Sequence, residues 1–185
     1  MLIIDNFLTQ FADLQAYAFD AKYQDEVNDI DGVTYPQICR DIPRAIREEV
    51  LQRLALIKGA PVTDYTMFLR RSPAGVHCPH QVHSDNSMGV FSFMLYLNRP
   101  EHCQGGTSMV RHLETGVAFA PERAEFLDAI RADQNTPDAW AIVQMIDMVP
   151  NRGAVFEANT LHRAEPVGGF GEGAEGRVVL TCFFT

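Results

Sequence analysis

The chain has 185 residues, which is enough for one compact domain with a sizeable core and leaves no room for a second catalytic domain. Its 24 acidic and 15 basic residues give a net charge of -9, so the overall field repels phosphate backbones and nucleic acid is not an expected partner. The first residues lack the positive region of a secretory signal, no apolar run approaches the length needed to cross a bilayer, and the four cysteines show no paired motif. We therefore expect reduced thiols, no membrane partner and a cytoplasmic location.

The first part of the chain, residues 1–61, predicts helical support for a later sheet. A short apolar strand at 2–4 is followed by a helix that begins after Thr9, with apolar side chains at helical spacing. A second amphipathic helix lies within 43–59, because a proline stands near its first turn and a glycine just past its end. Residues 25–41 are acidic and irregular in pattern, so we expect a surface loop or part of a substrate entrance there.

From residue 62 onward, short β-rich runs separated by Gly, Pro and Asn are typical of an antiparallel sandwich or barrel. One helix, at 121–131, should interrupt these strands as an insertion. We predict a mainly β, α+β fold: a double-stranded β-helix (jelly-roll, cupin-like) with N-terminal helices packed on one sheet. Residues 1–185 would then form one domain, with 1–61 as support and 62–185 as the core. The expected strands are 63–70, 80–84, 90–98, 107–112, 140–148, 154–157, 161–165 and 178–184.

Three residues could form a metal site. His83 and Asp85 stand two positions apart on an expected strand, so their side chains should point to the same face. His162 lies far downstream on another expected strand of the same barrel. Two histidines and one carboxylate occupy one face of an octahedral ferrous ion and leave positions open, whereas structural zinc sites are closed by four protein ligands. The three residues therefore predict an open iron site.

A His-x-Asp pair also occurs by chance, so the other histidines have to be considered. His77, Cys78 and His80 precede His83 closely enough to suggest a zinc cluster. On a strand, however, His80 and His83 face opposite ways, and we favour contacts near the mouth of the site for all three. For His112 we favour a core histidine with satisfied hydrogen bonds.

The order of motifs from residue 63 to the end resembles the prolyl-hydroxylase-like branch of the 2-oxoglutarate/Fe(II) dioxygenases. The His-x-Asp is followed by Tyr96-Leu97-Asn98, a Gly105-Gly106-Thr107 stretch, a distal histidine and a basic residue that opens the last strand. The resemblance implies that iron is held by the triad described above. It also implies that Tyr96, Arg177 and Thr181 bind the distal carboxylate of 2-oxoglutarate.

The resemblance implies that the chain is an oxygenase that uses Fe(II) and the co-substrate 2-oxoglutarate and releases succinate and CO₂. The simplest outcome is hydroxylation of its substrate. The substrate could be a small molecule or a peptidyl side chain, and the oligomeric state is open. Two alternatives remain. One is a cupin-like metal-binding protein that does not use 2-oxoglutarate, and the other is a non-catalytic barrel used for binding or sensing.

The last strand supports the co-substrate pocket from its own spacing, because Arg177, Thr181 and Phe183 share parity and face one side. A guanidinium, a hydroxyl and an apolar wall suit a small dicarboxylate. Arg163 is the alternative cation, although on a regular strand it points away from the face of His162. Residues 168–176, which lie between Arg163 and Arg177 in the chain, are rich in glycine and predict a mobile flap over the site.

Overall fold

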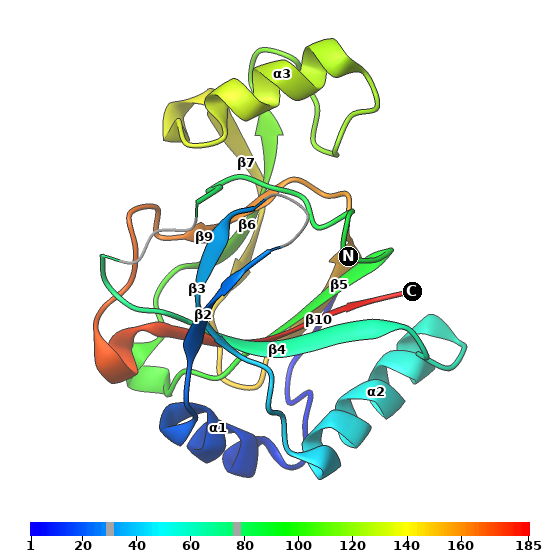
Figure 1. Ribbon diagram of the computed structural model, residues 1–185, viewed down its shortest axis with the longest axis vertical. Helices are drawn as coiled ribbons and strands as arrows, with labels where there is room; N and C mark the ends of the chain where they lie inside the picture. The colour runs from blue at the N-terminus through cyan, green and yellow to red at the C-terminus, as the bar shows by residue number, and fades with distance from the viewer. Residues whose placement is uncertain (29–31, 76–78) are drawn as a thin grey trace.

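The computed structural model describes residues 1–28, 32–75 and 79–185, and its strands form two antiparallel sheets (Figure 1). The large sheet has the order β1 (Leu2–Ile4), β8 (Gly153–Glu157), β5 (Phe91–Tyr96), β10 (Arg177–Phe184), β4 (Tyr65–Ser72), β3 (Thr34–Cys39) and β2 (Gln24–Val27). The small sheet has the order β7 (Trp140–Asp147), β6 (Gly106–His112) and β9 (His162–Glu165). The helices are α1 (Phe11–Asp20), α2 (Arg44–Lys58) and α3 (Ala124–Asp133), with short 3-10 turns η1 (Pro100–His102), η2 (Pro137–Ala139) and η3 (Gly173–Glu175).

The layers follow the apolar faces of the elements. In α2, Ile46, Val50 and Leu54 recur every four residues and are buried, so this helix packs its apolar stripe on the large sheet. Helix α1 joins the same core through Leu14 and Ala18. Both helices lie on one side of the molecule in Figure 1, and α3 lies at the opposite end beyond the small sheet. The expected N-terminal helices on one sheet are confirmed.

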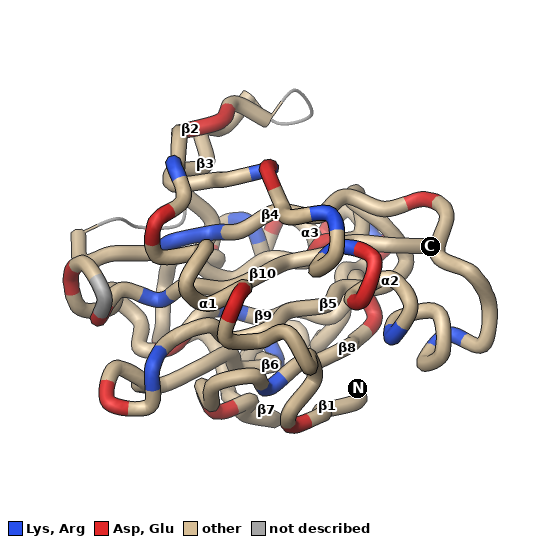
Figure 2. The backbone as a smooth tube through the Cα atoms, turned by 90° about the horizontal axis from the view of Figure 1, so that it is seen from below, with Lys and Arg blue, Asp and Glu red and all other residues tan. Residues whose placement is uncertain are grey.

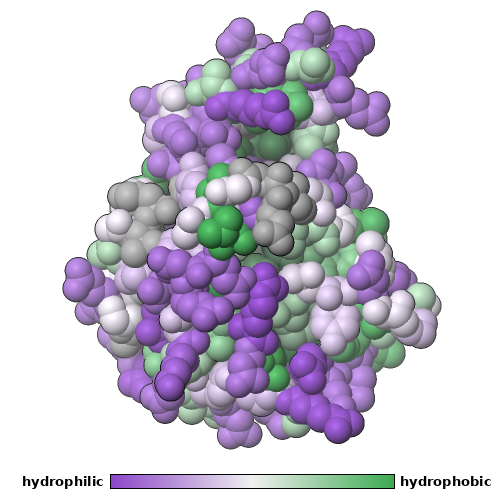
Figure 3. Space-filling view, viewed as in Figure 1, coloured by the Kyte–Doolittle hydropathy of each residue, from purple (hydrophilic) through white to green (hydrophobic). Residues whose placement is uncertain are grey.

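A second apolar cluster lies between the two sheets and makes the structure a β-sandwich. Met94 and Val179 of the large sheet contribute to it together with Met109 and Ile146 of the small sheet. Basic and acidic positions are interspersed along the chain (Figure 2). The face in Figure 3 is mostly hydrophilic with a small apolar area near its centre. Among the described helices, none is long and apolar enough to span a bilayer.

Three expected elements differ from the structure. Residues 80–84 do not form a strand: only His83 makes an isolated bridge, because prolines, serines and a glycine around it favour turns. Residues 25–41 are not simply irregular, since they contain β2 and β3, and β3 extends the large sheet at β4. Pro36 within β3 and the acidic composition obscured this hairpin. Helix α3 covers 124–133 rather than 121–131, because the backbone of Arg123 is still extended.

The glycine pair at the start of β6, Gly105 and Gly106, is required by close backbone approach. Gly106 has a φ of 152°, and a Cβ there would lie 1.9 Å from the carbonyl oxygen of Ile146. We expect Gly106→Ala to destabilise the protein by about 3 kcal/mol or more, since the backbone of β7 would have to shift. Urea unfolding measures this loss. Gly116→Ala is the control: it also replaces a glycine of positive φ, but has no atom within 4 Å of the added Cβ, and it should cost much less.

Glu49 of α2 fixes the start of α1. Its carboxylate accepts hydrogen bonds from the backbone N–H groups of Thr9 (2.7 Å) and Gln10 (3.3 Å) and pairs with Arg53. Burial alone raises the pKa of Glu49, but these hydrogen bonds outweigh it and lower the pKa to about 2. Because the folded-state pKa is depressed, the stabilisation is present above the ordinary pKa of 4.5 and is lost as the pH falls toward 2.

We therefore expect Glu49→Gln to lower the free energy of unfolding by roughly 1–2 kcal/mol at neutral pH. The difference from the parent should shrink between pH 4.5 and 2, the interval set by the pKa shift. Urea unfolding across this range is the measurement. Glu48→Gln, which removes an exposed pair with Arg44, should show neither effect. A pH-independent difference for Glu49→Gln would contradict the carboxylate's role.

Candidate metal centre and adjoining cavity

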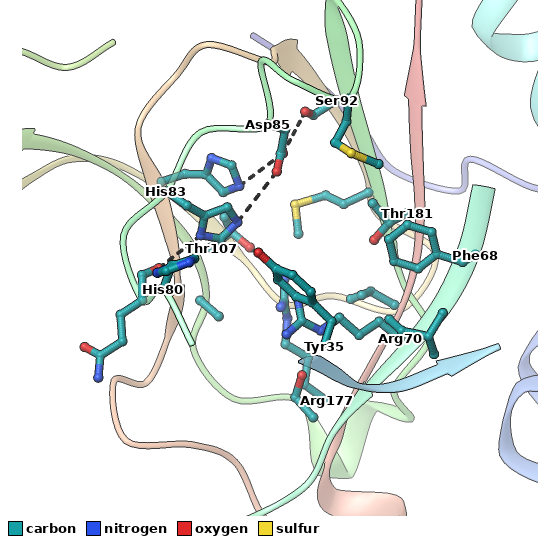
Figure 4. Close-up of a pocket in the computed structure, with 18 of the residues that line it drawn as sticks. Tyr35, Phe68, Arg70, His80, His83, Asp85, Ser92, Thr107, Arg177 and Thr181 are labelled. Atoms are coloured by element: carbon teal, nitrogen blue, oxygen red, sulfur yellow. Dashed lines mark hydrogen bonds and ion pairs between the residues drawn. The ribbon is translucent and has the colours of Figure 1, made fainter. Parts of the chain in front are cut away.

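His83, Asp85 and His162 come together in the structure. Their ligand atoms all lie within 4.8 Å of one another, and no other such cluster occurs in the part of the chain that is described. Nε2 of His162 is 3.4 Å from Oδ2 of Asp85, and Nε2 of His83 is 3.7 Å from Oδ1. The two imidazole rings are 4.5 Å apart (Figure 4). The arrangement offers two nitrogens and a carboxylate to one ion.

Backbone pairing holds the three residues in place. His83 and His162 form an antiparallel bridge in which each N–H donates to the other's carbonyl, at 3.1 and 3.0 Å. The N–H of Asp85 donates to the carbonyl of Ala158, and a turn follows in which Met88 donates back to Asp85. A bridge and a turn therefore bring His83 and Asp85 together, and neither residue lies in a regular strand.

The protonation state of the histidines suits a metal. Nδ1 of His83 is 3.2 Å from the carbonyl of Gln81, and Nδ1 of His162 is 2.9 Å from the carbonyl of Thr160. A carbonyl can only accept, so each Nδ1 carries the proton and each Nε2 presents a lone pair to the centre. Burial lowers the pKa of His83 to about 4, which keeps its ring neutral near pH 7. The Ser92 hydroxyl donates to Oδ2 of Asp85 at 2.8 Å.

A cavity of about 550 Å³ adjoins these residues and opens between the sheets and the β2–β3 hairpin. Strand alternation selects its walls: Phe68 and Arg70 of β4 face it, while Met67 and Leu69 face the helices. On β10 the four alternate residues Arg177, Val179, Thr181 and Phe183 all line it. The shared face expected for the last strand is therefore present. The β2–β3 hairpin also contributes walls, as a substrate entrance would.

At the inner end of the cavity, a hydrogen-bond chain connects three buried side chains. Arg177 is 9% exposed, and its Nη2 donates to Oγ1 of Thr107 at 2.9 Å. The Tyr96 hydroxyl donates to the same oxygen at 2.9 Å, and the tyrosine ring lies 5.7 Å from the guanidinium carbon. Burial raises the pKa of Tyr96. Tyr96 is fully buried and does not line the cavity, and its hydroxyl reaches the wall through Thr107. Its contribution to ligand binding stays a prediction.

Thr107 is a pocket residue that sequence reasoning missed. In the sequence, Thr107 stands out only as the residue after Gly105-Gly106, although it lies in the cavity wall beside Arg177. The signal was available, because the close approach that the glycines permit draws the start of β6 toward β7 and β9. A polar residue at that point faces the space between the sheets.

The alternative residues lie elsewhere. Arg163 donates to Glu165 at 2.7 Å and to the carbonyl of Pro137, and it does not line the cavity. His112 is fully buried, with its ring nitrogens 2.9 Å from Thr115 Oγ1 and from Asp133 Oδ2, which is the core role favoured for it. His80 lies in the cavity wall. The expectations for His77 and Cys78 fall outside the described residues.

The glycine-rich stretch 168–176 borders the cavity. Phe170 is buried in the cluster between the sheets, with its ring 5.8 Å from the guanidinium carbon of Arg177. The carbonyl of Gly171 accepts from the N–H of Ala74, and η3 follows. The stretch thus covers Arg177, and its movement on ligand binding stays a prediction.

Solved structures share this fold over almost the whole chain, although no family model and no curated protein matches the sequence. A prolyl-4-hydroxylase from Pseudomonas putida is 15% identical, with a TM-score of 0.51 and coverage of 99% of this chain and 90% of that one. EvdO2 from Micromonospora carbonacea, solved with 2-oxoglutarate, is 15% identical with a TM-score of 0.54, covering 98% and 84%. The non-haem α-ketoglutarate-dependent epimerase SnoN from nogalamycin biosynthesis is 14% identical with a TM-score of 0.55, covering 100% and 76%. The resemblance inferred from the motifs is confirmed at the level of the fold.

Proposed function

We propose that this chain, which has the fold of the 2-oxoglutarate-dependent oxygenases, is itself an Fe(II)- and 2-oxoglutarate-dependent oxygenase. The observation that carries the proposal is the convergence of His83, Asp85 and His162 on one side of a cavity that also contains the buried cation Arg177. Two imidazoles and one carboxylate leave positions open on an octahedral ion. A closed structural site would need a fourth protein ligand, and no further His, Cys, Asp or Glu joins the group in the described residues.

The donor set fits Fe(II), and the far end of the cavity fits 2-oxoglutarate. His83, Asp85 and His162 would hold the metal, and the Ser92 hydroxyl would fix the orientation of the carboxylate. Arg177 would bind the distal carboxylate of 2-oxoglutarate, with Thr181 and Thr107 as neutral donors in the same wall. Tyr96 would position Thr107 and stack near the guanidinium.

When bound, Fe(II) and 2-oxoglutarate supply oxidation by dioxygen coupled to decarboxylation of the co-substrate to succinate. The protein's own contribution is geometry and exclusion of water. Arg177 and Phe170 close the inner end of the cavity, and Phe156 packs edge-on against His162 at 5.0 Å. A preorganised pocket of this kind would direct the oxidant at the substrate and limit side reactions.

Under this proposal the two sheets would constitute a double-stranded β-helix, and residues 1–185 would form one oxygenase domain. Hydroxylation is the simplest outcome, although the neighbours include an epimerase as well as a prolyl hydroxylase. The mixed distribution of charge and the net charge of -9 favour a substrate other than nucleic acid.

The experiment is an anaerobic Fe(II) and 2-oxoglutarate titration of the purified chain, followed by exposure to air and measurement of succinate. We expect one Fe(II) per chain, 2-oxoglutarate binding that depends on the metal, and slow succinate formation even without substrate. Metal binding without 2-oxoglutarate binding would instead indicate a cupin-like protein of another class. Failure to bind metal would indicate a non-catalytic barrel.

A further inference from the structure

Arg70 is a second cation of the cavity, and it has no acidic partner among the described residues. It lies on β4, and its side chain lines the cavity. Its Nε is buried and has no hydrogen-bond partner. Its guanidinium carbon is 5.9 Å from the centre of the Tyr35 ring, an attraction that leaves the hydrogen-bonding edge of the guanidinium available.

The other charged side chains of the cavity wall each have an ionic partner or a proposed role. Arg40 is paired with Glu26 at 2.7 Å. Asp85 belongs to the proposed metal site, and Arg177 to the proposed co-substrate site. Arg70 is thus the remaining charge of the wall, and a partly buried cation is stabilised when an anion joins it.

The position of Arg70 separates it from the co-substrate end. It pairs in register with Val179, while Arg177 pairs with Ser72 two residues further along the same two strands. Arg177 is directed to Thr107 of the small sheet, whereas Arg70 is directed to Tyr35 of the hairpin. Figure 4 shows Arg70 on the side of Phe68 and Thr181, across the cavity from His83.

We propose that Arg70 binds the carboxylate of the substrate, which is therefore a small organic acid. This rests on the proposed function, since it assigns Arg177 to 2-oxoglutarate. One planar guanidinium matches one carboxylate through two parallel hydrogen bonds. The aromatic rings of Phe68 and Phe183, 5.9 Å apart, offer an apolar wall beside Arg70 for the carbon skeleton. A skeleton that extends from Arg70 across the cavity brings its C–H bonds toward the metal centre.

The test uses the full chain loaded with Mn(II) and 2-oxoglutarate under anaerobic conditions. Short aliphatic and aryl-substituted monocarboxylic acids, their primary amides and the matching phosphate monoesters are titrated by calorimetry. We expect at least one acid to bind roughly 30-fold or more tightly than its amide, and Arg70→Gln to abolish this preference. Arg70→Lys should retain part of it. Arg40→Gln, which removes a cation that already has a partner, should leave the preference intact.

Two further measurements distinguish the possible failures. The affinity for 2-oxoglutarate should hardly change in Arg70→Gln, and the ligand-free variant should melt close to the parent, because no ion pair or hydrogen bond with the described residues is lost and only the contact with the Tyr35 ring goes. The proposal is overturned if no acid binds more tightly than its amide, if phosphate monoesters bind more tightly than the acids, or if Arg70→Gln loses 2-oxoglutarate binding or unfolds at the temperature of the assay. In these cases the proposed function survives. If the parent does not bind 2-oxoglutarate at all, the proposed function itself fails.

Discussion

Replacing Arg177 by methionine should weaken 2-oxoglutarate binding roughly 30-fold to several-thousand-fold. Removing the buried cationic partner of a carboxylate typically costs about 2–5 kcal/mol of binding free energy. About 1.4 kcal/mol corresponds to a tenfold change in affinity. Arg177 is only 9% exposed, so water cannot take the place of the guanidinium. Affinity for Fe(II) should hardly change, because the side chain is not a proposed ligand. The measurement is the 2-oxoglutarate dependence of succinate formation, with metal binding followed separately.

Graded variants sharpen this result. Arg177→Lys should keep part of the affinity, since the charge remains and the planar fork is lost. Thr107→Val and Thr181→Val should each lose less, about 0.5–1.5 kcal/mol for a neutral hydrogen bond. Tyr96→Phe should act indirectly, through the orientation of Thr107.

Arg163→Met is the matched control, because it removes a buried arginine that binds Glu165 outside the cavity. If Arg163→Met loses 2-oxoglutarate while Arg177→Met keeps the parent's half-saturation, the co-substrate site has been placed on the wrong strand.

Substitution of a metal ligand should abolish turnover. His83→Ala and His162→Ala each remove one of three donors whose ligand atoms lie within 4.8 Å, and Asp85→Asn removes the anionic one. A site with two remaining donors binds Fe(II) weakly, because each lost ligand removes a coordinate bond from an already open site. An anaerobic Fe(II) titration should show a large loss of affinity in all three variants, together with loss of succinate formation.

The control is His102→Ala, because His102 lies in η1 and takes no part in the cluster of proposed metal ligands. It should bind Fe(II) like the parent. Circular dichroism of the three ligand variants should remain that of the parent, since the bridge between residues 83 and 162 is made by backbone atoms. An unchanged Fe(II) affinity in both His83→Ala and His162→Ala would contradict the assignment of the metal site.

Much of the architecture was predictable because it depends on local pattern. The apolar stripe of α2 and the αL glycine after it, Gly59 with a φ of 76°, locate that helix from spacing and capping alone. The strands from β4 to β10 follow apolar runs broken by turn residues, and seven of the eight expected strands are present. The hairpin of β2 and β3 is not evident from local pattern, because β2 is short and acidic and β3 is stabilised by pairing with β4 rather than by its own composition.

The sequence by itself determined the candidate ligands, the alternation of β10 and the choice of Arg177 over Arg163, because residue chemistry and period-two spacing can be read without coordinates. Only the tertiary structure decided how His83 and Asp85 meet His162, since a single bridge and a turn, not a strand, bring them together. It also decided that Thr107 stands between Tyr96 and Arg177, and that Arg70 enters the same cavity. These contacts join residues distant in sequence, and no local periodicity specifies them.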